Sequence, residues 1–350
     1  MPGAAPYPQP DPSAWGPILR AGWTEQLALR LRDGRYRRRG RRIAEAVLTP
    51  VAGTPAPVAP DALVLICVVR NARAYIGAFL DHYRGLGVAR FAIVDDRSDD
   101  GTREILDAAD DVDRFASDQT YREAAGGLAW RDALIERYGR GRWYVSVDAD
   151  EFLVYPGSET RKLPAFVADL ARAGLTRALA PMLDLYPQGR LADAAFDPAR
   201  HRHPAEVSPM IDGDGYHVAR EKFSLAIRGG PRTRIFGGEN RLSKFPLIFA
   251  DRATAYRGGS IHGPLPVTRN FSAPAAVLLH FKFSAASLTE FRTFVAEGGH
   301  FGGSMFYRRI TERADFGEDL SLAYPGSIRI EGSADLVRRG FMVDLSGPAV

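Results

Sequence analysis

The sequence predicts an α/β protein with a mainly parallel central sheet flanked by helices and a small mixed region later in the chain. Two observations support this prediction. Apolar runs of strand length, rich in β-branched residues, occur at 62–69, 91–96 and 143–153. Segments with helical spacing of apolar residues alternate with them, at 74–86, 102–109 and 128–138. This alternation is typical of parallel strands that are covered by helices on both faces.

The bulk composition fits a globular protein with a sizeable core. The chain has 350 residues, of which 45% are hydrophobic and 25% charged, with a net charge of +4. This mild positive charge suits a small anionic ligand. It forms no stripe of the kind that binds nucleic acid, so we expect no nucleic-acid partner. The single cysteine, Cys67, lies in an apolar run and should be a buried thiol.

The first 60 residues differ in composition from the rest. We expect a disordered, Pro-rich leader over 1–16 and one or two helices over 17–48, followed by a Pro/Ala linker at 50–60. An arginine-rich run extends from Arg30 to Arg42. It is either a solvated basic arm or a peripheral contact with an acidic membrane surface. The leader does not resemble a signal peptide and no apolar run reaches 18 residues, so we expect a cytoplasmic protein, with possible attachment at the inner face of the membrane.

We expect one domain over 61–345. After its first part, 61–155, the segment 156–285 combines a helix near 163–173, a strand near 176–185 and many short strands and loops. A strand at 277–283 precedes the C-terminal helices of 286–345. The first of these helices, at 287–296, opens on Ser287 with Glu290 three residues on, which is a capping-box pattern.

Polar residues follow each of the first three predicted strands. They are Arg70 and Asn71, then Asp95 and Asp96, then Asp148, Asp150 and Glu151. Ligands of open parallel sheets bind at the carboxyl ends of the strands, so we expect these side chains to share one site.

The pair Asp148 and Asp150 predicts a metal site. Two carboxylates at i and i+2 of an extended segment point to the same side and repel one another unless a cation or hydrogen-bond donors lie between them. Hard oxygen ligands suit Mg²⁺ or Mn²⁺. The pair is embedded between apolar segments, which argues against a merely solvated acidic surface.

The segments LICVVRNARAYIGAFLDHYRGLGVARFAIVDDRSDDGT and WYVSVDADEFL resemble the nucleotide-sugar half of the GT-A fold. More narrowly, they resemble glycosyltransferase family 2-like proteins whose acidic motif reads D-x-D-E-F. The clear resemblance covers 61–155, and a weaker one continues to about 285 through KFPLIF and LLHFKF. It implies metal-dependent transfer of a sugar from a nucleotide-sugar, with a UDP-sugar as the expected donor, to a glycan or small-molecule hydroxyl. It further implies inversion at the sugar and a place in polysaccharide synthesis, and it makes 156–285 the acceptor side.

The resemblance also implies a role for each strand-end residue. Arg70 and Asn71 would border the base. Asp96 would bind the base or ribose, with Asp95 as the neighbouring candidate, although Asp95 could instead cap a turn.

The metal and phosphate positions follow from the same resemblance. Asp148 would lie near the ribose and the metal with its waters, and Asp150 would bind the Mn²⁺ or Mg²⁺ directly. His280 would complete the metal or diphosphate site, unless it is a core histidine. Lys244 and Lys282 could act on the phosphates as point charges.

The catalytic base is less well defined. The chain has no clear copy of the family's Glu-Asp acceptor motif, and Asp184 and Glu239 are the candidates for a base that deprotonates the acceptor. The segment 228–241, with four arginines and four glycines, is either a phosphate-binding loop or a solvated hairpin. His201 and His203 are expected in a solvated loop. His262 is expected in a loop and could border the acceptor.

Two other functions stay open. A nucleotidyltransferase would share the sheet, the metal and the paired acids, but no Gly-rich loop follows the first strand. The motifs of P-loop, dinucleotide-binding and serine hydrolase proteins are missing from the sequence as well. A non-catalytic nucleotide- or carbohydrate-binding protein is the second alternative, because fold does not fix function.

Overall fold

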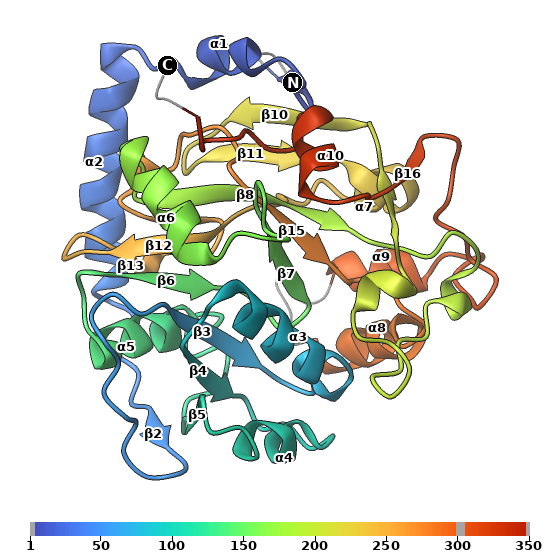
Figure 1. Ribbon diagram of the computed structural model, residues 1–350, viewed down its shortest axis with the longest axis horizontal. Helices are drawn as coiled ribbons and strands as arrows, with labels where there is room; N and C mark the ends of the chain where they lie inside the picture. The colour runs from blue at the N-terminus through green and yellow to red at the C-terminus, as the bar shows by residue number, and fades with distance from the viewer. Residues whose placement is uncertain (1–3, 299–304, 348–350) are drawn as a thin grey trace.

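A nine-stranded sheet forms the centre of the computed structural model, which describes residues 4–298 and 305–347 (Figure 1). The strand order is β2-β5-β4-β3-β6-β12-β8-β15-β7. The strands of this sheet are β2 (Thr49–Pro50), β3 (Val64–Val69), β4 (Arg90–Asp95), β5 (Val112–Ala116), β6 (Arg142–Ser146), β7 (Glu151–Val154), β8 (Arg177–Asp184), β12 (Ser243–Ala250) and β15 (Val277–His280).

The sheet is mixed. Strands β5, β4, β3 and β6 pair in parallel, as expected for the first part of the domain. β15 also runs parallel to β8, but β12 runs antiparallel to both β6 and β8, β7 to β15, and β2 to β5, so the sheet is mixed and not mainly parallel as predicted. Between β8 and β12 the chain forms short strands and no long crossover helix on the sheet, which is compatible with an antiparallel return.

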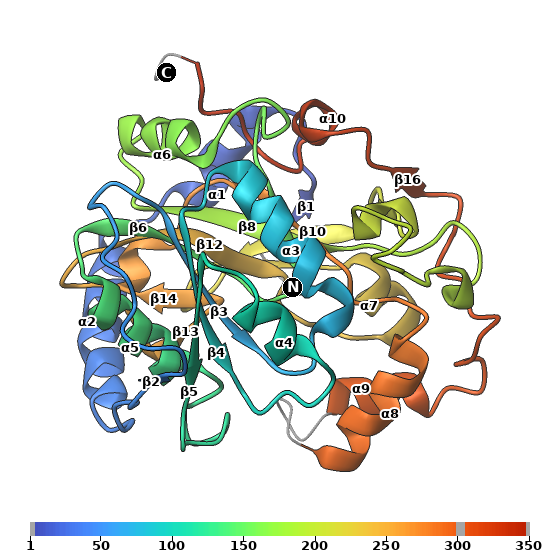
Figure 2. The same ribbon diagram turned by 60° about the horizontal axis from the view of Figure 1, so that its bottom comes forward.

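Helices cover both faces of the sheet (Figure 2). Along β3, Leu65 and Cys67 face a cluster that contains α3 and α6, whereas Val64 and Ile66 face α5. The alternation of side chains along an extended strand explains why its sequence is apolar throughout. The helices are α1 (Trp15–Leu19), α2 (Trp23–Gly40), α3 (Arg73–Leu86), α4 (Thr102–Asp107), α5 (Leu128–Tyr138), α6 (Leu163–Arg172), α7 (Gly230–Phe236), α8 (Ser287–Glu297), α9 (Met305–Thr311) and α10 (Ser333–Arg338).

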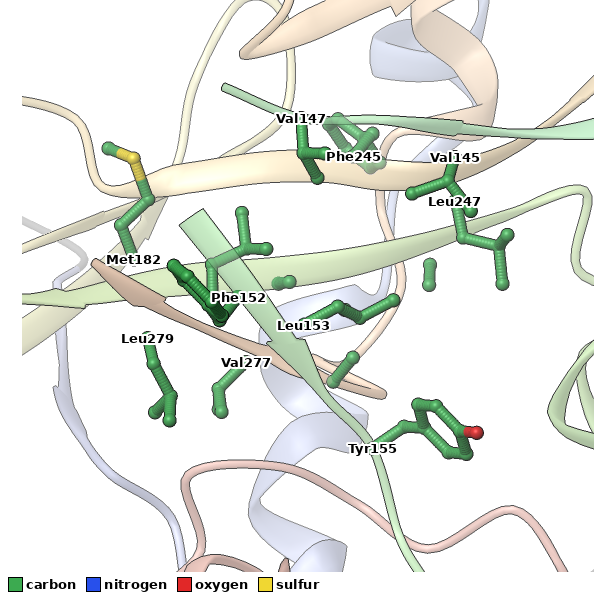
Figure 3. Close-up of a cluster of buried hydrophobic side chains, with 14 of the residues drawn as sticks. Val145, Val147, Phe152, Leu153, Tyr155, Met182, Phe245, Leu247, Val277 and Leu279 are labelled. Atoms are coloured by element: carbon green, nitrogen blue, oxygen red, sulfur yellow. The ribbon is translucent and has the colours of Figure 1, made fainter. Parts of the chain in front are cut away.

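The third predicted strand, 143–153, is interrupted. It forms β6 and β7, which lie far apart in the sheet, and the acidic motif occupies the turn between them. Buried side chains on both sides of this turn hold it in place (Figure 3). Val145 and Val147 precede it, and Phe152 and Leu153 pack against residues of β8 and β15 after it. Each fully buried side chain of this size contributes roughly 1.5–3 kcal/mol.

Three small antiparallel sheets complete the fold. They are formed by β1 (Ala5–Tyr7) with β10 (Tyr216–Arg220) and β11 (Leu225–Arg228), by β13 (Ala255–Ser260) with β14 (Gly263–Leu265), and by β9 (Met210–Asp212) with β16 (Ser327–Arg329).

The prediction of a disordered leader is wrong for residues 4–16, and residues 1–3 lie outside the described chain. β1 pairs with β10, and Tyr7 and Trp15 are buried. The Tyr7 hydroxyl donates to the carbonyl of Phe341 at 2.5 Å, and its ring makes edge contacts with Trp15, Tyr216 and Phe341. Prolines are compatible with this edge position because an edge strand needs fewer N–H donors.

The arginine-rich segment is an ordered helix, α2. Leu29 is buried against Leu265 and Val267, and Gly40 lies so close to Gly258 that a Cβ at either position would overlap the other segment's backbone. Across 4–298 and 305–347, no helix has the length and apolar character needed to span a bilayer.

Candidate active site

The loops after β3 and β4 are joined by hydrogen bonds. Asn71 adopts a positive φ of 54°, its backbone N–H donates to Ser98 Oγ at 3.0 Å, and its Oδ1 accepts from the N–H of Asp99 at 2.9 Å. Asparagine tolerates this left-handed conformation better than most residues. The polar residues after the first two strands therefore lie side by side, as expected, next to the exposed Arg70.

Asp95 and Asp96 have different surroundings. Asp95 is buried, and its two oxygens accept from the backbone of Ser98 at 3.1 Å and from Arg103 at 2.8 Å. This is the turn-capping arrangement. Asp96 accepts from Arg97 at 2.8 Å. Burial raises the pKa of Asp96 above its ordinary value, although the neighbouring Arg97 opposes the shift.

The acidic motif folds as a tight turn in which Asp148 and Glu151 bond to each other. The N–H of Asp148 donates to Glu151 Oε2, and the N–H of Glu151 donates to the carbonyl of Asp148, both at 3.1 Å. Two buried cations then hold the Asp148 carboxylate: Arg131 from α5 and Lys244 from β12, each at 2.6 Å. Burial alone would raise the pKa of Asp148, but Lys244 and Arg131 hold it well below its ordinary value.

Lys244 also forms an ion pair with Glu151, which is fully buried. Burial raises the pKa of Glu151 despite the ammonium group beside it. In turn, Asp148 and Glu151 raise the pKa of Lys244, which burial alone would lower. The three groups thus form one charged cluster at the turn, in which Lys244 and Glu151 are buried and the Asp148 side chain is 35% exposed.

A second series of polar contacts runs from Asp150 through His280 to Asp184. Its Oδ2 lies 3.3 Å from Nε2 of His280, and its carbonyl accepts from the N–H of Phe281 at 2.9 Å. His280 Nδ1 lies 2.6 Å from Asp184, and Arg232 from α7 donates to both Asp184 oxygens at 2.6 Å. Arg232 Nη2 also lies 2.8 Å from Nδ1, but the shorter contact of Nδ1 is with the Asp184 carboxylate. That carboxylate favours a proton on Nδ1, which leaves Nε2 directed at Asp150.

These contacts shift the pKa values of His280 and Asp150. Burial would lower the pKa of His280, but Asp150 and Asp184 raise it above its ordinary value. His280 in turn lowers the pKa of Asp150, against the effect of burial. With 28% of its side chain exposed, Asp150 remains accessible to a ligand, whereas Asp184 has no exposed side-chain surface.

The donor atoms fit a divalent cation. Asp150, Glu151 and His280 each offer a ligand atom, and these atoms lie within 4.8 Å of one another. Ligand atoms at about 2.1 Å from an ion and at right angles to each other are roughly 3 Å apart, close to the separation of Asp150 and His280. A histidine whose other nitrogen donates to a carboxylate is the usual form of a metal-binding histidine. Asp148 is not in this group, and its oxygens are held by Arg131 and Lys244. Glu151 also bonds to Lys244 and to the N–H of Asp148, which leaves Asp150 and His280 as the ligands with the freer donor atoms.

Lys282 lies beside the same site. Its ammonium group is 5.1 to 5.9 Å from the ring centres of Phe291, Phe294 and Tyr307 in α8 and α9. Burial would lower the pKa of Lys282, but Tyr307 and Asp150 raise it, so the side chain is a cation. The aromatic rings restrict this cation next to Asp150.

Other candidates lie apart from this cluster. Glu239 is exposed in the loop after α7, where its backbone carbonyl accepts from Arg228. His262 lies in the turn between β13 and β14, as expected, where it is half-buried and 2.7 Å from the carbonyl of Ser243. His203 is partly buried against Phe152 and Phe281, so it is not in the solvated loop that we expected. His201 lies 3.2 Å from the N–H of Asp197.

The segment 228–241 is neither a phosphate loop nor a hairpin, because its centre forms α7. Arg232 and Arg234 of this helix bind Asp184 and Asp212. Arg131 was not predicted as part of the site, and Arg232 only as one of the arginines of the segment 228–241. Both lie in helices remote from the acidic motifs in the chain, and only the fold brings them to the carboxylates.

Comparisons with known proteins give no family. No protein-family model matches the chain, and no curated protein matches it. Among solved structures it is similar to S. aureus TarS, with 18% identity, a TM-score of 0.29, and a match over 37% of this chain and 23% of that one. It is also similar to the mannosyltransferase PcManGT from Pyrobaculum calidifontis, solved with GDP-Man and Mn²⁺, with 22% identity, a TM-score of 0.27, and a match over 45% of this chain and 43% of that one. A third similar structure is a 4-diphosphocytidyl-2C-methyl-D-erythritol synthase, with 16% identity, a TM-score of 0.24, and a match over 36% of this chain and 63% of that one.

Each of these matches spans less than two thirds of the other protein's length. TM-scores and identities this low carry no argument about activity, so the function has to be argued from the residues of the site.

Proposed function

We propose that this protein is a metal-dependent glycosyltransferase, which moves a sugar from a nucleotide-sugar to a glycan or another hydroxyl acceptor. The observation that carries the proposal is the meeting at 3.3 Å of His280 with Asp150, which lies in the turn that follows β6. Strand β6 pairs in parallel with β3, and β3 with β4, the strands that Asn71 and Asp96 follow. A cation site beside the carboxyl ends of parallel strands is where an α/β sheet would hold a nucleotide diphosphate.

The roles that we propose follow from position and charge. Asp150 and His280 would hold the Mn²⁺ or Mg²⁺, with Glu151 within reach. The ion would neutralise negative charge on the leaving diphosphate. Lys282, fixed beside Asp150, would add a point charge to the same phosphates. Asn71 and Asp96 would border the base and ribose.

Two residues change role in this proposal. Asp148, already neutralised by Arg131 and Lys244, would orient the turn and meet the ribose side rather than bind the ion. Asp184 would be a positioning residue that fixes the tautomer of His280, because its side chain has no exposed surface for an acceptor hydroxyl. Glu239 would then stay the exposed candidate for the base, and inversion at the sugar stays part of the proposal.

A thermal-shift panel tests the donor site. We expect the protein to be stabilised by one class among UDP-, GDP-, CMP- and dTDP-sugars, with a UDP-sugar as the first choice, and only with Mn²⁺ present. A ligand at 100 times its Kd stabilises by about 2.7 kcal/mol. The shift should vanish in Asp150→Ala and persist in Asp319→Ala, a control that removes a carboxylate with 91% side-chain exposure. The proposal fails if no nucleotide gives a metal-dependent shift.

A further inference from the structure

One face of α2 is exposed and apolar over its first half. Trp23, Leu27 and Leu31 are spaced by four residues and are 77%, 51% and 68% exposed. Residues four apart lie on the same side of a helix, so the three side chains form a continuous stripe. Isolated exposed apolar residues are ordinary, but a stripe of this length on one helix face marks a contact surface.

Arginines border and extend this stripe. Arg30, Arg35 and Arg38 are exposed on the same side of the helix, at helical positions within about 80° of Leu27. Across the described residues, no side-chain hydrogen bond or ion pair joins these three arginines to another group. The outer face is therefore apolar at its first half and strongly basic at its second.

The acids of α2 are turned the other way. Glu25 forms an ion pair with Arg220 at 2.8 Å, and Asp33 accepts from the N–H of Val267 at 2.5 Å. No carboxylate of the helix is left to neutralise the outer arginines. Together with Leu29 and the Gly40–Gly258 contact, these bonds fix which face of α2 points outward.

The helix also lies at the edge of the molecule. In both views α2 forms the left border of the protein, on the side away from α8 and α9 (Figures 1 and 2). The cation site lies next to α8, so a flat surface could contact α2 without covering the site.

We propose that the outer face of α2, defined by Trp23, Leu27, Leu31, Arg30, Arg35 and Arg38, docks on a bilayer surface that contains anionic lipids. Aromatic and aliphatic side chains flanked by arginines are the composition of helices that lie in the plane of the membrane interface, with the apolar part among the acyl chains and the arginines at the phosphates. The helix has 18 residues and is about 27 Å long, so it can bring all six side chains to one flat surface.

Charge favours a membrane over a second copy of the chain. In a symmetric dimer through this face, the arginines of one copy would approach those of the other, with no acid on the face to pair with them. An anionic lipid surface offers a negative group to every arginine. This proposal is independent of the proposed activity, because none of the six residues belongs to the site.

Vesicle binding of the full-length protein tests the proposal. We expect cosedimentation with vesicles of phosphatidylcholine and phosphatidylglycerol, weaker binding at high salt, and little binding to phosphatidylcholine alone. The triple variant Arg30→Gln, Arg35→Gln, Arg38→Gln should lose on the order of 100-fold in affinity. Leu27→Glu with Leu31→Glu should lose at least about 10-fold. These side chains are exposed, so both variants should keep the melting temperature of the wild type.

A matched control removes the same charge elsewhere. Arg202→Gln, Arg252→Gln, Arg329→Gln changes three exposed arginines outside α2 and should bind vesicles as the wild type does. Trp23 adds a direct readout because it is the most exposed of the four tryptophans: Trp15 and Trp130 are buried, and Trp143 is half-buried. Its fluorescence should shift to the blue on vesicles and be quenched by brominated lipids, and Trp23→Phe should remove that signal.

Three results would overturn the proposal. The wild type could fail to bind anionic vesicles, or the control could lose as much affinity as the α2 variants. Alternatively, sedimentation velocity could reveal a dimer that Leu27→Glu with Leu31→Glu dissociates, which would assign the face to a second copy. The metal-dependent donor shift, measured on the same variants, should be unchanged, so failure of this proposal and failure of the proposed function are distinguishable.

Discussion

Replacing Asp184 by Asn separates a positioning role from a catalytic one. Asp184 accepts from His280 Nδ1 at 2.6 Å and from Arg232 twice at 2.6 Å. The amide keeps the shape of the carboxylate but loses its charge and offers N–H donors. It therefore no longer fixes a proton on Nδ1, and Nε2 is no longer held as the free nitrogen that faces Asp150.

The size of the effect follows from this geometry. Loss of a carboxylate that orients a metal-binding histidine typically lowers metal affinity 10- to 100-fold, which is about 1.4 to 2.7 kcal/mol. Arg232 is buried as well, so the variant also loses charge-assisted hydrogen bonds, each of which contributes about 1.5–3 kcal/mol to stability. We expect a lower melting temperature and, well below it, weaker Mn²⁺ binding.

Mn²⁺ titration followed by electron paramagnetic resonance measures this directly, since free and bound Mn²⁺ have different signals. The control is Glu239→Gln, at an exposed carboxylate outside the cluster, which should bind Mn²⁺ as the wild type does. If Asp184→Asn binds Mn²⁺ with unchanged affinity but loses turnover, Asp184 acts on the acceptor and the positioning argument is refuted.

Three further predictions concern stability. Burial lowers the pKa of His262 to about 3, assisted by Lys244, and burial with the nearby His203 lowers that of His82 to about 4. Above pH 6.5 these two histidines are neutral folded or unfolded, whereas below it only the unfolded chain takes up their protons; urea titrations should therefore lose about 2 kcal/mol per histidine between pH 6.5 and 5, and an unchanged slope in His82→Gln would contradict the assignment. Gly258→Ala should destabilise by at least about 1–3 kcal/mol, because its φ is +86° and the new Cβ would meet the backbone of α2; a melting temperature equal to the wild type would exclude the tight contact. Lys244→Met should cost about 3–5 kcal/mol in urea unfolding by leaving the buried carboxylate of Glu151 without its cation, whereas Asp148, with 35% of its side chain exposed, keeps Arg131; a loss below 1 kcal/mol would show that Glu151 is neutralised otherwise.

Periodicity in the sequence predicted the local elements better than their arrangement. The apolar runs and helical spacings identified β3, β4, α3, α5 and α6 to within a few residues. The break between β6 and β7 escaped prediction, because both strands are apolar and only the pairing of β7 with β15 separates them. The antiparallel direction of β12 relative to β6 and β8 also depends on tertiary packing, which the local sequence of β12 does not reveal.

In the candidate site, too, local features were predicted better than contacts between distant segments. The acids at the strand ends were visible as polar residues after apolar runs, and their nearness followed from the geometry of parallel strands. His280 came from the family resemblance alone, since no spacing links it to Asp150. Arg131 carried no signal, and Arg232 was visible only as one arginine of the segment 228–241, because an arginine in a helix is usually solvated and becomes informative only when the fold buries it beside a carboxylate.

Product analysis of nucleotide-sugar turnover tests the central claim most directly. The donor class found in the binding panel would be incubated with the protein and Mn²⁺ without acceptor, and its phosphorus products followed by nuclear magnetic resonance. We predict slow release of the nucleoside diphosphate and free sugar, abolished by chelation of the metal and in Asp150→Ala. A reaction that needs added pyrophosphate and gives the nucleoside triphosphate and a sugar 1-phosphate would instead indicate a nucleotidyltransferase, and no turnover by a protein that binds the donor would indicate a binding protein.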